Sequence, residues 1–416
     1  MTLEEIGSRA KAVSRTLNNL GSREKNIGLE EAARALLEGE DEILAANQAD
    51  YEKAESSGMS KGMLDRLALN PGRIQSMADG LLKVAALDDP VGEVISMKLR
   101  PNGLKIGQKR VPLGVIAMIY EARPNVTADA FGLCFKSGNA VILKGGSDAI
   151  ESNKAIAKWL RTGLTRAGLP EDALQLIEDT SRETTKELMR LNRYVDVLIP
   201  RGGAGLIRSV VENSTIPVIE TGTGNCHVYV DKAADLAKAV SIIVNAKASR
   251  PSVCNAEEVC LVHRDVAAQF LPLLKKAIVD DRAAAGLVPV ELRLDPAAAR
   301  IIDGTPAGER DFDTEFLDYI LAVGVVDSVD AAIAHIAAHS THHSDCIVTE
   351  DAAAAKKFTE QVDSAAVYVN VSTRFTDGGE FGLGCEMGIS TQKLHARGPM
   401  GLDELCTYKY VVRGSG

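Results

Sequence analysis

The sequence predicts an α/β protein with two parallel-sheet domains and a separate β-ribbon. Short apolar runs alternate with amphipathic helical segments along most of the chain, and strands that alternate with helices imply right-handed crossovers and parallel pairing. Two segments of alternating polarity flank an Asn-Gly pair, and a similar segment lies near the end of the chain. The 416 residues exceed the usual size of one domain, so more than one domain is expected.

The chain begins with a helical segment that leads into the ribbon. Thr2-Leu-Glu-Glu5 matches a capping box, and residues 28–37 repeat apolar side chains at helical spacing, with charges expected on a solvated face. Residues 94–100 and 104–111 alternate around Asn102-Gly103, which predicts a hairpin. Because two strands alone are marginally stable, we expect residues 405–413 to pair with this hairpin or across a subunit boundary.

Two sets of apolar runs predict two parallel sheets. The first set covers residues 114–119, 140–143, 195–199 and 228–230, with a helix over 152–167. The second covers residues 258–262, 320–326, 345–348 and 366–370, with helices over 266–285 and 329–338. Ligands of such sheets bind outside the carboxyl ends of the strands, so the loops at 120–125, 144–147, 200–205 and 220–224 are expected to hold functional residues.

The segment Arg250-Pro-Ser-Val-Cys254 is the main candidate for chemistry. Pro251 ends the preceding helical run, because the residue before a proline is pushed out of the helical region. Cys254 is therefore expected at a chain reversal between a helix end and a strand, where a thiol can face a cleft. A free cysteine is more often a small buried apolar residue, so these residues alone leave both interpretations open.

Composition and charge exclude several classes of function. A net charge of -10 argues against nucleic acid as the main partner. The sequence shows no signal-peptide pattern and no apolar run near the length of about 20 residues that spans a membrane. The 7 cysteines lack the regular spacing of a disulfide framework, which suits free thiols in a reducing cytoplasm.

Two loops could hold a phosphate-containing cofactor. Gly202, Gly203 and Gly205 follow a strand and open a helix, so their N–H groups could bind a pyrophosphate, although a plain tight turn has the same pattern. Lys144 stands at a strand end before Gly145-Gly146-Ser147 and could pair with ribose or phosphate oxygens, with no carboxylate expected there to repel a 2′-phosphate. The alternative is a surface lysine in a turn.

The histidine-rich segment is not predicted to bind a metal. Its side chains follow no standard ligand spacing, and capping or subunit-contact roles are favoured for His335, His339, His342 and His343.

Several segments together resemble one known family. Ala332-Ile-Ala-His-Ile-Ala-Ala-His-Ser-Thr-His-His-Ser-Asp-Cys-Ile347 is similar to a motif of the gamma-glutamyl phosphate reductases, the glutamate-5-semialdehyde dehydrogenases of proline biosynthesis. Residues 120–127, 250–257, 367–375 and 388–399 resemble further motifs of that family, in the same order along nearly the whole chain. The resemblance implies an aldehyde dehydrogenase-like fold with two Rossmann-like domains and an oligomerisation ribbon. The domain boundaries that we predict are 1–91 and 113–228 for the cofactor-binding domain with its helical entry segment, 229–369 for the catalytic domain, and 92–112 and 370–416 for the oligomerisation hairpin and C-terminal segment.

The resemblance also implies a reaction and roles for individual residues. NADPH would reduce L-glutamate 5-phosphate to L-glutamate 5-semialdehyde with release of phosphate, through a thioester on Cys254. By the same resemblance, Asn125 and the Cys254 backbone N–H form the oxyanion site, Lys144 binds the adenosine ribose or its phosphate, and Glu315 lies at the nicotinamide ribose. Ser147 stands where NAD-preferring relatives often carry a glutamate, and its small neutral side chain favours NADPH.

Other site residues are assigned more loosely. Glu220 occupies the place of the water-activating base of hydrolytic relatives, and its role in a phosphorylating enzyme stays open. The cations expected to hold the anionic groups of the substrate are Arg250, Arg374 and Lys393. The expected assembly is a homo-oligomer, and the lability of the acyl phosphate favours contact with the glutamate 5-kinase that makes it.

Two other classes of function use the same residues. A cysteine hydrolase would employ the thiol with a nearby histidine such as His227 as base. A non-catalytic α/β binding module would use the glycine loops and leave the thiol idle. An absorbance assay at the nicotinamide band, with and without phosphate, separates the three classes.

Overall fold

The computed structural model describes residues 1–121 and 123–415; Ala122, within the 120–127 motif, and Gly416 lie outside the described residues. The chain forms two compact units. The first unit comprises Met1–Thr221, Gly382–Gly388 and Leu394–Gly416, and the second comprises Gly222–Phe381 and Ile389–Lys393. Within the described ranges, no helix combines the length and the apolar character needed to cross a bilayer.

The first unit contains a parallel sheet with strand order β5-β4-β3-β6. Its strands are β3 (Val115–Tyr120), β4 (Ala140–Gly145), β5 (Leu174–Leu176) and β6 (Val197–Arg201). Every residue of β3 and β4 is buried, as expected for strands covered on both faces. The helices of this unit are α1 (Leu3–Leu17), α2 (Ser22–Glu38), α3 (Glu40–Ser56), α4 (Lys61–Leu67), α5 (Pro71–Ala86), α6 (Asn125–Lys136), α7 (Ile150–Arg166), α8 (Arg182–Leu188) and α9 (Ala204–Asn213).

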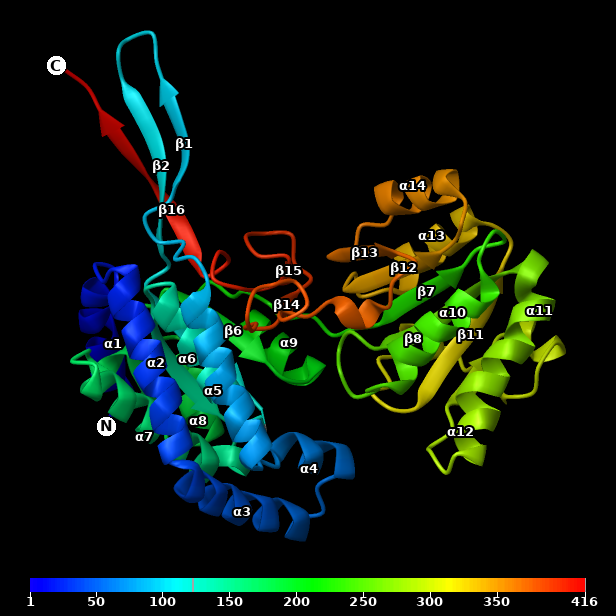
Figure 1. Ribbon diagram of the computed structural model, residues 1–416, viewed down its shortest axis with the longest axis horizontal. Helices are drawn as coiled ribbons and strands as arrows, with labels where there is room; N and C mark the ends of the chain where they lie inside the picture. The colour runs from blue at the N-terminus through cyan, green and yellow to red at the C-terminus, as the bar shows by residue number, and fades with distance from the viewer. Residues whose placement is uncertain (122, 416) are drawn as a thin grey trace. The chain divides into compact units, whose positions relative to one another are not determined.

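The ribbon is a three-stranded antiparallel sheet with order β1-β2-β16. Its strands are β1 (Val94–Leu99), β2 (Lys105–Pro112) and β16 (Cys406–Arg413), and Figure 1 shows them extending away from the rest of the first unit. The predicted hairpin and its pairing with the C-terminal strand are confirmed. Large apolar side chains remain exposed on all parts of it except the central strand: Val94, Ile95, Met97, Leu99, Tyr408, Tyr410 and Val412.

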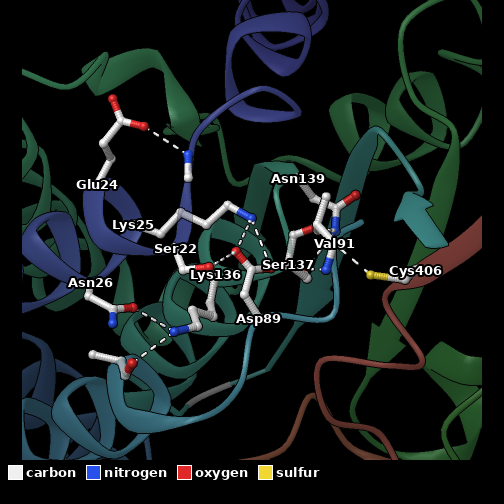
Figure 2. A network of polar contacts seen from close by, with 12 residues as sticks. Ser22, Glu24, Lys25, Asn26, Asp89, Val91, Lys136, Ser137, Asn139 and Cys406 are labelled. Carbon is white, nitrogen blue, oxygen red and sulfur yellow. Dashed lines mark hydrogen bonds and ion pairs between the residues drawn. The ribbon is translucent and has the colours of Figure 1, made fainter. Parts of the chain in front are cut away.

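A buried polar network holds the three points where the chain enters or leaves the ribbon (Figure 2). Lys25 of α2 forms an ion pair with Asp89 at 2.8 Å, and Asp89 also accepts a hydrogen bond from the backbone N–H of Val91, just before β1. Asn139 accepts from the N–H of Gly114, after β2, and donates to the carbonyl of Leu405, before β16. These side chains tie the base of the ribbon to the helices and sheet of the first unit.

The prediction that charges of the N-terminal helices form a solvated face is wrong for Lys25, whose side chain is 0% exposed. A second buried lysine, Lys136 of α6, donates to Asn26 at 2.5 Å and to the carbonyl of Ala85 at 2.8 Å. Burial lowers the pKa of Lys136, and the negative charge of Asp89 opposes this shift. Both ammonium groups are therefore structural.

The second unit contains a seven-stranded parallel sheet with order β10-β9-β11-β8-β7-β12-β13. Its strands are β7 (Cys226–Val230), β8 (Glu257–His263), β9 (Glu291–Leu294), β10 (Thr305–Pro306), β11 (Ile320–Val326), β12 (Ser344–Val348) and β13 (Ala366–Val369). The two-residue strands β14 (Ile389–Ser390) and β15 (Gly398–Pro399) belong to the second and the first unit, respectively.

Helices cover both faces of this second sheet (Figure 1). Side chains of α10 (Leu236–Ile243) and α11 (Arg264–Lys275) pack with Cys260 and Val262 on one face. Those of α13 (Val329–His339) and α14 (Ala352–Gln361) pack with Val259 and Leu261 on the other. The chain continues from α11 through the π-helical turn η4 (Lys276–Asp280) into α12 (Asp281–Ala284).

The sequence assigned residues 228–230 to the first sheet, and this is wrong. These residues lie in β7, which pairs with β8 and β12 in the second sheet. Three apolar residues mark a buried strand, but they do not specify the sheet in which it pairs.

Candidate active site

Cys254 lies in the short connection between a π-helical turn and β8. The π-helical turn η3 spans Val244–Ala248 and follows α10 directly, and β8 begins at Glu257. The helical run ends before Arg250-Pro251, as the proline predicts. Cys254 itself is half-buried. The thiol therefore sits between two regular elements with part of its surface accessible, and π-helical turns are frequent at functional sites.

The loop that enters β7 packs directly on the backbone of Cys254. A Cβ atom at Gly224 would lie 1.4 Å from the Cys254 carbonyl oxygen, so only glycine fits there. The thiol of Cys226 donates to the same oxygen at 3.3 Å. The Gly224 N–H donates to Glu315 at 2.7 Å, which links this loop to the half-buried carboxylate expected at the nicotinamide ribose. The backbone of Cys254 is thus held by close packing that is possible only because residue 224 is a glycine without a side chain.

The other six cysteines are poorly suited to nucleophilic chemistry. Desolvation is the main cause that raises the thiol pKa of Cys134, Cys226, Cys260, Cys346, Cys385 and Cys406. A thiol that stays protonated at neutral pH is a weak nucleophile, because the thiolate is the reactive form. These observations favour Cys254 as the reactive cysteine.

Two of the three predicted substrate cations share an electrostatic environment with Cys254. The pKa of the half-buried Arg374 guanidinium is lowered, first by burial and then by the positive charge of Arg250, while Asp377 and Cys254 act in the opposite direction. The Nε of Arg374 is buried without a hydrogen-bond partner among the described residues. A buried, unsatisfied guanidinium donor near a second arginine is suited to binding an anion.

Asn255 connects the Cys254 segment to the loop that holds Arg374. Its side-chain amide donates to the carbonyl of Thr376 at 2.9 Å and to that of Arg374 at 3.2 Å, and its Oδ1 accepts a hydrogen bond from the Arg374 guanidinium. The residue that follows the thiol therefore sets the position of the cation. The third predicted cation, Lys393, is exposed and forms an ion pair with Asp363.

The first unit holds the predicted oxyanion donor. Asn125 is the exposed first residue of α6, and its Nδ2 donates to Asp129 at 3.0 Å. Desolvation is the main cause that raises the pKa of Asp129 to about 6, while the charge of Arg201 and the bond from Asn125 oppose this shift. Asp129 thereby orients the Asn125 amide.

Lys144 lies at the carboxyl end of β4, as predicted, and its side chain is buried. Its Nζ donates to the carbonyl of Gly145 at 3.3 Å, and burial lowers its pKa, a shift that Asp179 opposes. The sequence predicted that no carboxylate stands at this loop. This is wrong, because the charge of Asp179 acts on Lys144 and Asp148 directly follows Ser147. Ser147 is exposed and donates to its neighbour Asp148 at 3.3 Å.

The glycine loop at the start of α9 already contacts a carboxylate. Gly203 is the N-cap of this helix, and its N–H donates to the exposed side chain of Glu121 at 2.9 Å. A Cβ at Gly202 would lie 2.6 Å from the same carboxylate, whereas a Cβ at Gly205 would meet open space. A pyrophosphate at this helix end would therefore replace Glu121. Glu220 is half-buried at the end of the first unit.

Comparison with known proteins identifies the family. Residues 2–286 match the model of the aldehyde dehydrogenase family. The gamma-glutamyl phosphate reductase of Neisseria meningitidis serogroup C is 61% identical over 407 residues, which are 98% of this chain and 97% of the relative. That of Streptococcus gordonii is 58% identical over 413 residues, 99% of this chain and 98% of the relative. The chain belongs to the gamma-glutamyl phosphate reductase family.

A solved structure agrees with this assignment. The crystal structure of the Thermotoga maritima gamma-glutamyl phosphate reductase matches with a TM-score of 0.93 and 49% identity, covering 99% of this chain and 98% of that chain. The predicted aldehyde dehydrogenase-like fold is confirmed, and the chain is an oxidoreductase. Membership of the aldehyde dehydrogenase family implies a nicotinamide cofactor. The non-catalytic binding module is thereby excluded.

The cysteine hydrolase alternative is also incompatible with membership of this reductase family and with the environment of His227. This side chain is completely buried, and its Nδ1 lies 3.0 Å from the carbonyl oxygen of Asn225. Desolvation is the main cause that lowers its pKa to about 3. An imidazole that is so difficult to protonate is a poor general base at neutral pH.

The histidine-rich segment forms a packed cluster. The His335 ring lies 4.3 Å from that of His339 and 5.4 Å from that of His227, measured between centroids. Burial lowers the pKa of His335 to about 3 and that of His343 to about 4. In the ranges 1–121 and 123–415, no group of three or more His, Cys, Asp or Glu side chains is arranged to hold a metal ion.

Replacing His343 by glutamine is expected to reduce acid sensitivity. Because the folded pKa of His343 is about 4 instead of 6.5, only the unfolded chain binds this proton between those values. The stability that neutral His343 contributes is complete above the unfolded pKa and is lost as the pH falls towards the folded pKa. From about pH 7.5 to about pH 5, the free energy of unfolding should fall by about 2 kcal/mol more in the wild type than in the variant, as measured by urea unfolding. A difference that is independent of pH would contradict this assignment.

Several residues of the site carried no usable signal in the sequence. Glu121 and Asp148 are single carboxylates in loops, and only their contacts with Gly203 and Ser147 reveal their importance. Asn255 directly follows the candidate nucleophile, but its bonds join it to residues 119 and 121 positions away. Position next to Cys254 could have drawn attention to Asn255. Glu121 and Asp148 could not have been distinguished from other surface acids.

Proposed function

We propose that the protein reduces L-glutamate 5-phosphate to L-glutamate 5-semialdehyde with release of phosphate, as a step of proline biosynthesis. The observation that carries this proposal is the grouping of the half-buried Cys254 with Arg374 and Arg250, two cations suited to an acyl phosphate. The relatives over nearly the full chain bear the name of this activity, which supports the same substrate.

Cys254 is the proposed nucleophile. Its thiolate attacks the acyl carbon of the substrate, the C–O bond to phosphate breaks, and a thioester forms. Phosphate leaves with both electrons of that bond, and the charges of Arg250 and Arg374 stabilise it. Asn125 Nδ2 and the Cys254 backbone N–H are the proposed donors to the oxyanion. The buried Nε of Arg374 is available for an oxygen of the phosphate or of the substrate carboxylate.

The cofactor that we propose is NADPH, which would supply the hydride that reduces the thioester to a thiohemiacetal. Expulsion of the Cys254 thiolate from the thiohemiacetal then gives the aldehyde. Lys144 fits a cofactor phosphate, because it is a buried cation at a strand end whose Nζ donates to the carbonyl of the neighbouring Gly145. Glu315 would hold the nicotinamide ribose, and Gly202, Gly203 and Gly205 would face the pyrophosphate once Glu121 has moved. Glu220 has no assigned step, because activating water would hydrolyse the thioester.

The ribbon is the proposed oligomerisation element. Its outer strands expose large apolar side chains, including Leu99 at 72% and Tyr410 at 61% exposure. Exposed apolar patches of this kind mark protein interfaces. We therefore propose a homo-oligomer. We also propose that residues 1–91 and the part of 113–228 that precedes β7 form the cofactor-binding domain, and that β7 belongs with the catalytic domain, 229–369.

The reverse reaction provides the test of this function. The purified chain is incubated with L-glutamate 5-semialdehyde, NADP+ and inorganic phosphate, and absorbance is followed at the nicotinamide band. We expect reduction of NADP+ that requires phosphate. Reduction without phosphate would indicate a hydrolytic dehydrogenase, and absence of reduction with either NADP+ or NAD+ would refute the proposal.

Replacing Ser147 by glutamate is expected to shift cofactor preference from NADPH towards NADH. A carboxylate here would repel a 2′-phosphate and accept a hydrogen bond from a 2′-hydroxyl, which should change the ratio of kcat/KM values by at least about tenfold. Asp148→Asn is the matched control, because it removes the neighbouring carboxylate and should shift preference in the opposite direction. Unchanged ratios in both variants would contradict the assignment of this loop.

A further inference from the structure

One buried base precedes Cys254 and two buried acids follow it, and none of the three takes part in the steps described above. Glu257 and Glu258 begin β8, and Lys247 lies on the π-helical turn η3; all three are 0% exposed. The Lys247 ammonium forms an ion pair with Glu258 at 2.5 Å. Desolvation raises the pKa of both acids, and the charge of Lys247 opposes the shift. Burying an ion pair costs free energy of desolvation, so the presence of Lys247 and Glu258 in the interior requires a reason.

An irregularity in the sheet directs Glu258 towards Lys247. Cys226 of β7 pairs with Glu257, but the next residue, His227, pairs with Val259, so Glu258 is the extra residue of a bulge. Bulges change the direction of a side chain and are frequent beside active sites.

Glu258 also holds the loop that carries Glu315. Its Oε1 accepts a hydrogen bond from the backbone N–H of Leu317 at 3.2 Å. Leu317 has a φ of 54°, an unfavourable conformation for a side chain other than glycine, so this part of the loop needs support. Two residues earlier, Glu315 accepts from Gly224, which packs on the carbonyl of Cys254. The contacts therefore connect Lys247, Glu258, the Glu315 loop and the nucleophile in one continuous set.

We propose that Glu258, held by Lys247, is a positioning residue that fixes the Glu315 loop for cofactor binding. This inference rests on the proposed function, because it takes Glu315 as the residue at the nicotinamide ribose. Glu258 touches neither substrate nor cofactor and acts through the Leu317 backbone. Its removal should weaken the binding of the nicotinamide cofactor and leave the binding of semialdehyde and phosphate unchanged.

A matched pair of double variants separates this role from folding. Lys247→Met with Glu258→Gln removes both charges but keeps an oxygen that can accept from Leu317. Lys247→Met with Glu258→Met has similar volume and no acceptor. Replacing a buried ion pair by apolar side chains is often neutral for stability, so both are expected to fold. We expect a KM for NADP+ about tenfold above wild type in the methionine variant and within about threefold in the glutamine variant.

The outcomes decide the proposal. The expected result is a rise in KM for NADP+ with little change in KM for semialdehyde, together with rescue by glutamine. If the methionine variant does not fold, Glu258→Asp provides the comparison, because it keeps the charge near Lys247 and withdraws the oxygen from Leu317. A wild-type KM for NADP+ in the folded variants that lack the Leu317 contact would overturn the proposal, as would equal losses in the glutamine and methionine variants.

A binding measurement keeps this test distinct from the test of the proposed function. If wild-type protein fails to reduce NADP+ with semialdehyde and phosphate, the proposed function fails. Dissociation constants for NADPH, from fluorescence titration of the same variants, still report whether Glu258 positions the loop. The expected result there is the same ranking, with the methionine variant weakest.

Discussion

Replacing Cys254 by alanine is expected to abolish phosphate-dependent reduction of NADP+ with L-glutamate 5-semialdehyde. Without the thiolate, no thioester forms, and hydride transfer has no covalent intermediate on which to act. Removal of a covalent nucleophile lowers kcat by about 10⁴-fold or more, because the remaining groups act only together with it. Initial rates at the nicotinamide absorbance band give the loss. Circular dichroism and NADPH titration should show an unchanged fold and cofactor binding.

The control is Cys385→Ala. Cys385 and Cys254 are the two half-buried cysteines, but burial raises the pKa of Cys385 well above its ordinary value. Cys385→Ala should retain activity within about twofold of wild type, since a thiol that stays protonated contributes no nucleophile. Retained turnover in Cys254→Ala, or equal losses in the two variants, would refute the assignment of Cys254.

The sequence predicted most of the sheet strands, because a parallel strand buried on both faces is a continuous apolar run. This holds for β3, for residues 140–143 of β4 and for residues 259–262 of β8. It failed for β5, β9 and β10, which have three, four and two residues and give patterns that are too short. It also assigned β7 to the wrong sheet, because strand pairing depends on contacts between distant segments. The ribbon was predictable, since its turn and alternation are local features.

The sequence likewise predicted only part of the candidate site. The residue types and the family resemblance predicted Cys254 as the nucleophile, but the sequence did not distinguish between the three candidate cations. The charges of Arg250 and Cys254 both act on the Arg374 guanidinium, whereas Lys393 forms an ion pair with Asp363. The ion pair of Lys25 with Asp89 joins residues 64 positions apart, and in the sequence Lys25 is one of many helical lysines. Polar contacts between residues so far apart produce no periodic pattern in the sequence, so they could not be predicted from it.

Replacing Gly224 by alanine is expected to lower kcat/KM by about 100-fold or more, because it displaces the backbone of the nucleophile. The added Cβ would lie 1.4 Å from the carbonyl oxygen and 2.4 Å from the carbonyl carbon of Cys254. These are backbone atoms, so no rotamer change relieves the contact, and a displacement of about 1 Å at a reacting group can cost about 100-fold in rate. The same movement would strain the Gly224 bond to Glu315, so the KM for NADP+ should also rise.

Gly62→Ala is the matched control, because Gly62 is exposed on α4, away from the loops assigned to the site, and a Cβ there has no atom within 4 Å. Its rate should remain within about threefold of wild type, since the substitution adds one methyl group without a clash. Thermal unfolding of both variants shows whether a loss of rate accompanies loss of the fold, and the rate of Cys254 alkylation by iodoacetamide reports on the thiol directly. A folded Gly224→Ala variant with the kinetics of Gly62→Ala would contradict the close packing of this loop on Cys254, and the positioning of the thiol would then have to come from η3 and β8 alone.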